Sequence, residues 1–343
     1  MVVATHGRSF WILDDVSPLR ELTSELFGAT HYLFKPRSTY RLRMAGRRLA
    51  EDSQPHMVNY ARADASLVSF EPAARPADGI ADRLLDAGAN PPAGVQIFYH
   101  LRDQPSGDVR LDILEPDGTP IRSFGATDLR ARAGLNRVVW DMRHPGVPSV
   151  KKVGNLDPWE RLHGPMVLPS TYRARLTVND RQLEQSFEIL ADPRLGDRAT
   201  ELTAQLEMLR EIYARLSACN ELVNRISQLE DQIASLRRWN PDLPGTIEAL
   251  LQQSGAIKEL LIDVNMRRAQ LYASGLHEKL NALIEFVDSG DYAPAQQARE
   301  VFAELAAQLD RLTNQFDATA RAHLPELSRL IEQSVSGEVM IPA

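Results

Sequence analysis

The chain has 343 residues, which is long enough for two or three domains that each bury a core. Hydrophobic residues make up 43% of it and charged residues 25%, values that exclude a largely disordered or membrane-embedded chain. The formal net charge of -7 argues against nucleic acid as a partner, because contact with phosphates requires a net basic surface.

Targeting and redox signals are sparse in this sequence. No apolar run approaches the roughly 20 residues of a membrane helix, so no membrane span is predicted. Residues 1–10 lack the basic start and apolar stretch of a signal peptide, so the chain as written is expected in the cytoplasm. The single cysteine, Cys219, can form neither an intrachain disulfide nor a zinc site alone, which leaves the redox compartment open.

The chain begins with the pattern of a β-hairpin. Apolar runs at residues 2–4 and 10–13 flank a turn at residues 6–8, which predicts two strands. Residues 15–26 predict a short capped helix or turn, and residues 33–44 predict one more extended piece. A two-stranded hairpin is marginal alone, and nothing soon after it supplies the further strands that it needs.

The middle of the chain changes from irregular to alternating. Residues 45–89 predict a long irregular linker with a helical turn near residues 80–85. Residues 90–192 alternate in short runs between turn signals, which predicts a β-sandwich with an immunoglobulin-like layout. Within it, the loop 141–171 is rich in proline and glycine and carries Trp159. A loop of that length predicts a binding lid or a cover over a sheet edge.

Residues 193–337 show helical periodicity almost throughout. Apolar residues recur at threes and fours in three stretches separated by short turns, the first of which is at residues 239–245. The second stretch can break near Gly255 or Gly275, and the third can break before Pro325. No single stretch can bury its apolar stripe alone, so an antiparallel three-helix bundle is predicted.

Several segments, in their order along the chain, also resemble those of a known family. THGRSFWILDD, SPLREL, HYLFKPRSTYRLR and NPPAGVQIFYHL resemble the last blade and exit segment of the VPS10/sortilin-like BNR-repeat β-propeller proteins, a glycosyl hydrolase-like family. VRLDILEPDGTPIRSF, AGLNRVVWDMR and LPSTYRARLTV are similar to the FlgD-type Ig-like domain that follows that propeller. ADPR and NALIEFVDSGDYAPAQQAREVFAELAAQLD are similar to the helical tail of the family.

The resemblance implies an α+β multidomain fold with a propeller-blade remnant (1–44), a linker (45–89), an Ig-like sandwich (90–192) and a helical bundle (193–337). Two features depart from the family. Ser170 stands where the family has a glycine, so the turn before Thr171 is expected to differ or to be strained. The Asp-box blade repeats are absent, and Met1 would fall inside a blade strand, so a fragment, a split gene or a mispredicted start is expected.

The weak binding candidates lie in the first hairpin and in the long loop. Arg8 with nearby carboxylates suggests a sugar-acid site, but that site would need arginines from several blades. The structural interpretation is favoured: Arg8 pairs with Asp14 or Asp15, and the apolar run packs between blades. An aromatic residue on a loop is a recognition candidate, although cover over the sandwich is favoured. The candidates are His6, Arg8, Trp11, Asp14, Asp15 and Trp159.

No catalytic, metal-binding or cofactor-binding residues are predicted. Carboxylate pairs such as Glu230 with Asp231 or Asp288 with Asp291 fall on a helix surface or in a capping turn. The histidines have no zinc-binding spacing, and no nucleophile elbow, phosphate loop or dinucleotide motif is present. Cys219 lies in an apolar stripe, where a thiol is inert.

Three functions remain open. The first is a non-catalytic interaction region that docks on or completes a β-propeller, supplied by an upstream region or a separate chain, with a glycan or peptide as a possible ligand. The second is the C-terminal part of a glycan-acting hydrolase whose catalytic residues lie upstream. The third is homo-oligomerisation through the helical bundle. The resemblance implies a periplasmic or secreted parent protein.

Overall fold

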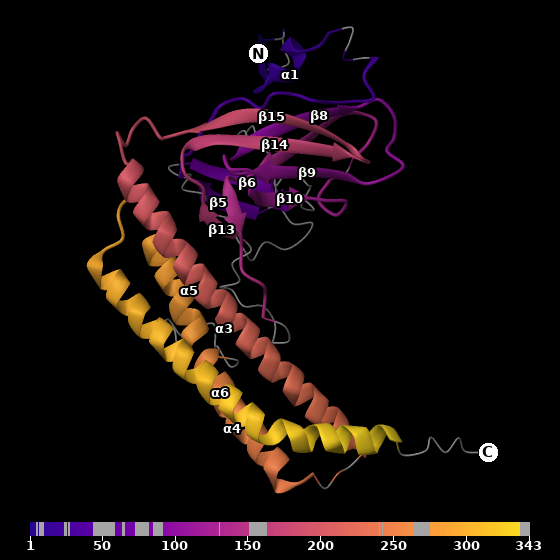
Figure 1. Cartoon of the computed structure of the whole chain (residues 1–343). Coiled ribbons are helices and arrows are strands. Elements are labelled where there is room, and N and C mark those ends of the chain that lie inside the picture. Colours follow the sequence, from indigo (N-terminus) through magenta and orange to yellow (C-terminus); the bar gives the residue numbers. More distant parts are fainter. Residues whose placement is uncertain are drawn as a thin grey trace, which may run out of the picture. The chain divides into compact units, whose positions relative to one another are not determined.

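The structure is a computed structural model of mixed helix and strand, which confirms the predicted coarse class (Figure 1). It describes residues 1–4, 6, 10–23, 26, 28–43, 59–63, 66–72, 82–84, 92–129, 131–150, 163–239, 241, 243–263 and 275–336. The chain divides into a β unit, Met1–His144 with Met166–Ala199, and a helical unit, Pro145–Pro165 with Thr200–Ala343. None of the described helices combines the length and apolar composition that crossing a bilayer requires.

Two sheets form the main part of the β unit. The larger has the strand order β10-β9-β14-β15-β4, and the smaller has the order β11-β8-β3. All pairings within them are antiparallel except that of β15 with β4. Their bounds are β3 His31–Leu33, β4 Thr39–Tyr40, β8 Val95–Leu101, β9 Val109–Leu114, β10 Pro120–Phe124, β11 Gly134–Trp140, β14 Ser170–Val178 and β15 Arg181–Leu190.

The two sheets also take strands from the segment assigned by resemblance to a blade remnant. β3 pairs antiparallel with β8, and β4 pairs parallel with β15. The link extends beyond β4, because Arg41 donates from its backbone nitrogen to Leu190 O at 2.8 Å and from Nε to Val167 O at 2.9 Å. Residues 31–41 therefore belong to the same sheets as residues 95–190, although residues 45–89 lie between them in the sequence.

Aromatic side chains meet in the core between these sheets. Trp140 lies edge-on to Tyr172 and Phe187, with ring centroids 5.8 and 6.2 Å apart. The polar atoms of these rings are satisfied locally: Trp140 Nε1 donates to Arg143 O at 3.0 Å, and Tyr172 OH donates to Leu168 O at 2.8 Å. Ser170, at the first position of β14, is not among the residues with positive φ, so serine is accommodated there without the expected strain.

Residues 59–84 differ from the sequence prediction. The sequence predicts an irregular linker with a helical turn, but the structure has a three-stranded antiparallel sheet, β5 Asn59–Ala63, β6 Ser66–Pro72 and β7 Asp82–Leu84. The helical turn predicted near residues 80–85 is wrong, since β7 occupies that position. Short strands such as these carry too little periodicity to be recognised without their partners.

The proline-rich loop, predicted as a binding lid or a cover over a sheet edge, is described only at its two ends. Its described ends form two short paired strands, β12 Arg143–Pro145 and β13 His163–Met166. Val147 and Val150 pack against the core of the helical unit. Residues 151–162, and with them Trp159, lie outside the described residues.

The described part of the helical unit contains α3 Ala199–Trp239, α4 Gly245–Leu261, α5 Leu276–Val287 and α6 Gln296–Ser336. The break expected near Gly275 is confirmed, because this glycine directly precedes α5. A Cβ at Gly275 would lie 2.9 Å from Ile262 Cα, so glycine permits a close approach between the end of α4 and the start of α5. Pro325 lies inside α6, which continues past it instead of breaking.

Polar contacts define the directions of the helices. Gln205 near the start of α3 donates to Val287 O at the end of α5, at 2.7 Å. Glu230 near the other end of α3 pairs with Lys258 of α4, at 2.6 Å. α4 and α5 therefore run antiparallel to α3.

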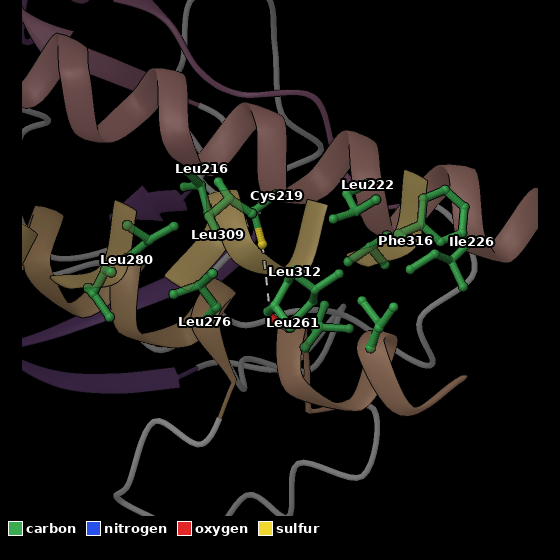
Figure 2. Close-up of a cluster of buried hydrophobic side chains, with 14 of the residues drawn as sticks. Leu216, Cys219, Leu222, Ile226, Leu261, Leu276, Leu280, Leu309, Leu312 and Phe316 are labelled. Carbon is green, nitrogen blue, oxygen red and sulfur yellow. Dashed lines mark hydrogen bonds between the residues drawn. The ribbon is translucent and has the colours of Figure 1, made fainter. Parts of the chain in front are cut away.

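α6 returns in the direction of α3. Arg215 pairs with Asp310 at 2.6 Å, and Arg225 pairs with Asp317 at 2.8 Å, so residue numbers rise together along the two helices. Figure 2 shows the apolar side chains that these four helices enclose. They include Leu216, Cys219, Leu222 and Ile226 of α3, Leu261 of α4, Leu276 and Leu280 of α5, and Leu309, Leu312 and Phe316 of α6.

Candidate interaction site

The N-terminal hairpin forms a separate two-stranded sheet. β1 (Val2–Ala4) pairs antiparallel with β2 (Phe10–Ile12). The ladder continues through two further bonds, Leu13 N to Met1 O at 2.8 Å and Met1 N to Leu13 O at 2.7 Å. Within the described part of the chain, no third strand pairs with this sheet, so both of its edges are open there.

Both faces of the hairpin are apolar and exposed. Directly opposed residues share one face of an antiparallel pair, so Val2 and Ile12 lie on one face and Val3 and Trp11 on the other. Their exposed fractions are 65% and 72% on the first face and 42% and 65% on the second. Sheets with two apolar faces are normally covered on both sides. The hairpin thus has the side chains of a buried strand pair in an exposed position.

A polar groove of about 490 Å³ follows the hairpin directly in the sequence. One wall consists of residues 14–17 with 20–21, around the short helix α1 (Ser17–Arg20), and the other consists of residues 35–38. Asp15 Oδ1 accepts bonds from the backbone nitrogen and hydroxyl of Ser17, at 2.8 and 2.7 Å, which holds the first wall in place.

Two contacts connect the walls. Arg37 pairs with Asp14 across the groove at 3.8 Å. Glu21 accepts bonds from Tyr32 OH at 3.2 Å and from the backbone nitrogen of Lys35 at 3.4 Å. Burial, together with the hydrogen bond to Glu21 and its charge, raises the pKa of Tyr32. The groove is open to solvent and carries charges of both signs, of which Asp14, Asp15 and Glu21 already have partners within it.

The structure gathers only some of the sequence candidates. Asp14 and Asp15 line the groove, and Trp11 lies in β2, three residues before Asp14 in the sequence. His6 is exposed in the turn at the far end of the hairpin. Arg8 and Trp159 lie outside the described residues, so the predicted pairing of Arg8 falls there too, whereas Asp14 pairs with Arg37.

Four charged groove residues were not among the sequence candidates. Arg20 and Glu21 follow a proline closely, and Lys35 and Arg37 flank another. Charged residues near prolines were therefore the feature of the sequence that could have pointed to the groove. That signal could not show that the two segments face each other, because this depends on the contacts of Asp14 with Arg37 and of Glu21 with Lys35.

Other chemistry is sparse. Among the described residues, no group of three or more histidine, cysteine, aspartate or glutamate side chains could hold a metal ion. Cys219 is fully buried, and burial, followed by the charge of Glu278, raises the pKa of its thiol to about 12. Glu230 pairs with Lys258, and the backbone nitrogen of Asp288 donates to Ile284 O at the end of α5. These groups therefore have structural roles.

No family model, curated protein or solved structure matches the chain in any of the three comparisons.

Proposed function

We propose that this chain is a non-catalytic interaction region of a VPS10/BNR-repeat propeller protein. Its hairpin β1–β2 docks on or completes a β-propeller that an upstream region or a separate chain supplies. The observation that carries this proposal is the exposure of apolar side chains on both faces of the hairpin.

The two-faced pattern favours insertion over surface contact. A hairpin that lies on a single layer needs only one apolar face, and its other face remains polar. Propeller blades are sheets arranged around a common axis, so a blade strand is covered by neighbouring blades and pairs through its edges. Val3 and Trp11 on one face and Val2 and Ile12 on the other meet that requirement, and the open edges offer the hydrogen bonds.

The finer interpretation of the fold supports the same family. We interpret the two main sheets as an Ig-like sandwich: Trp140 fills its core, and Tyr172 bonds a carbonyl four residues upstream, as a tyrosine corner does. We interpret the helices as a three-part bundle in which each part runs antiparallel to the next. The parts are α3, the successive pair α4 and α5, and α6. In this proposal the hairpin makes the docking contact, and the sandwich and the bundle have structural roles. The charged groove would form the polar edge of the docking interface.

The test is complex formation with a separately expressed BNR-repeat propeller chain, with mass measured by light scattering. A one-to-one complex is expected, and Ile12→Asp should abolish it because the charge would have to be buried between layers. Leu135→Asp is the matched control, since Leu135 is also an exposed strand residue, at 53%, but lies on β11. A stable homodimer without propeller binding would instead favour the oligomerisation alternative.

An assay with generic glycosides tests whether this chain is catalytic by itself. The hydrolase alternative also predicts an inactive chain, because its catalytic residues would lie upstream. The isolated chain is expected to be inactive, because Asp14 is paired with Arg37 and Asp15 with Ser17 in an exposed groove. Turnover that disappears in Asp14→Ala would overturn the non-catalytic proposal.

A further inference from the structure

The described ends of the proline-rich loop, residues 145–150 and 163–165, are held by one helix. Three side chains of α3 donate to backbone carbonyls of these ends, which are called the strap below. Asn220 Nδ2 donates to Pro148 O at 2.8 Å, and Asn224 Nδ2 donates to Ser149 O at 3.2 Å. Tyr213 OH donates to His163 O at 3.0 Å. The donors are seven and four residues apart, so they lie on one face of α3.

Two of the strap contacts differ in their surroundings. Asn220 is 2% exposed, whereas the bond from Asn224 lies at the surface, where water can replace it. A buried donor that loses its acceptor costs more than an exposed one, because no solvent compensates. Asn220 is therefore the principal attachment of the first end of the strap.

The side chain of Asn220 is in turn oriented by a series of buried hydrogen bonds from residues of α5. His277 Nδ1 lies 2.7 Å from Asn220 Oδ1, and Asn281 Nδ2 lies 3.1 Å from His277 Nε2. Asn281 Nδ2 also donates to His277 O at 3.1 Å. His277 is 2% exposed, and Asn281 is fully buried. This series of hydrogen bonds thus runs from α5 through α3 to the strap, and His277 and Asn281 within it are shielded from solvent.

The backbone carbonyls at the two ends of this series determine every proton in it. Pro148 O can only accept, so the amide nitrogen of Asn220 faces it, and Asn220 Oδ1 must face His277. That oxygen can only accept, so His277 Nδ1 carries the proton. At the other end, His277 O can only accept, so the amide nitrogen of Asn281 faces it and also donates to Nε2. The Asn220 end requires a proton on Nδ1 and the Asn281 end requires an Nε2 without one, so the two ends together specify the Nδ1–H tautomer.

We propose that Asn281, His277 and Asn220 form a one-directional hydrogen-bond relay that locks the strap to the helical unit, with His277 in the Nδ1–H tautomer as the locked state. In such a relay each bond polarises the next, so the loss of one donor weakens the links beyond it. The first described end of the strap is then held by a series of hydrogen bonds that begins on α5. His277 and Asn281 are positioning residues, since they act on the strap only through Asn220.

Thiol labelling of a strap residue tests the relay. Val147→Cys places a thiol in the strap, where the side chain packs against the helical core. The native Cys219 is buried and its thiol pKa is raised, so it should contribute little to the labelling signal. Asn220→Asp keeps the shape and the acceptor for His277 but places a second oxygen against Pro148 O. We expect it to raise the labelling rate roughly tenfold, with the helices intact by circular dichroism.

Tyr213→Phe is the matched control. It also removes one donor from the strap, but at the other end, so labelling through Val147→Cys should stay within about twofold of the parent rate. Asn281→Leu, which changes no residue in contact with the strap, should raise the rate about threefold through the relay. Equal rates in the parent, Asn220→Asp and Asn281→Leu proteins would overturn the proposal. So would equal acceleration by Tyr213→Phe and Asn220→Asp.

Nitrogen NMR of histidine-labelled protein tests the direction of the relay without a change in stability. The ring of His277 is expected to show a protonated Nδ1 and an unprotonated Nε2, and Asn220→Asp should shift the Nδ1 signal. A proton on Nε2 in the unmodified protein would contradict the relay, even if the labelling rates changed as expected.

Discussion

Two strand pairs of this protein contain a tryptophan among aliphatic residues and end in opposite environments. Trp140 of β11, paired with β8, is 1% exposed, whereas Trp11 of β2, paired with β1, is 65% exposed. Both pairs are antiparallel and regular in register, so strand formation does not distinguish them. The difference is that β11 and β8 face a second sheet across a shared core, and the hairpin lacks a facing layer within the described residues. An apolar strand pair without such a layer is consistent with the docking surface proposed above.

The largest expected effect sharpens this comparison directly. Trp140→Ala removes a buried indole that contacts Tyr172 and Phe187 and should destabilise the β unit by about 3–5 kcal/mol. Trp11→Ala, the matched change on the hairpin, should stay within about 0.5 kcal/mol. Native-state hydrogen exchange of β8 and β14 amides measures both. Equal effects would mean that the hairpin is buried within this chain.

A smaller effect is expected where the end of α4 meets the start of α5. Gly275→Ala places a Cβ 2.9 Å from Ile262 Cα and 3.0 Å from Leu261 O, and should destabilise the helical unit by about 1–3 kcal/mol. Gly255→Ala lies inside α4 with open space around it, and should stabilise that unit by roughly 0.5–1 kcal/mol. Urea unfolding followed by far-UV circular dichroism measures the change in the free energy of unfolding for both variants. Changes of the same sign would contradict the close approach between α4 and α5 at Gly275.

Tyrosine hydroxyls allow a comparison within the β unit. Tyr172→Phe leaves Leu168 O without its donor beside a buried ring, and should cost about 1–2 kcal/mol. Tyr32→Phe removes a bond to Glu21 in the water-exposed groove and should cost less than about 0.5 kcal/mol. Hydrogen exchange of the β unit provides the measurement. A larger cost for Tyr32→Phe would indicate that the groove is part of the core.

The last comparison concerns alkaline pH. The pKa of Cys219 is raised from 9.0 to about 12 in the folded protein, mainly by burial and then by the charge of Glu278. The folded thiol keeps its proton longer than the unfolded one, so its contribution to stability is complete below pH 9 and is lost between about pH 9 and 12. The stability of the helical unit should therefore fall less steeply over this range in Cys219→Ala. Parallel pH profiles would show that the thiol is accessible when folded.

The success of sequence prediction differed between elements for physical reasons. β8, β14 and the helical stripes were predictable because inward-facing residues repeat at the period of the element itself. β3 and β4 were covered only by the single extended piece predicted at residues 33–44, since two or three residues show no period and are ordered only by the strands they join. The hairpin half of the candidate site was predictable from local apolar runs. The groove half was not, because residues 14–21 and 35–38 are joined by contacts of Asp14 with Arg37 and of Glu21 with Lys35 that no local pattern shows.

The sequence by itself determined the longer strands of residues 95–190 and the helical stretches after residue 193, and it narrowed the break in the second stretch to Gly255 or Gly275. These properties depend on side-chain periodicity and backbone freedom within a few residues. Only the tertiary structure decided which strands share a sheet, which apolar faces remain uncovered and which polar side chains meet in the core. Each of these depends on contacts between distant residues, as between β4 and β15 or between Asn220 and His277, and no local pattern encodes them.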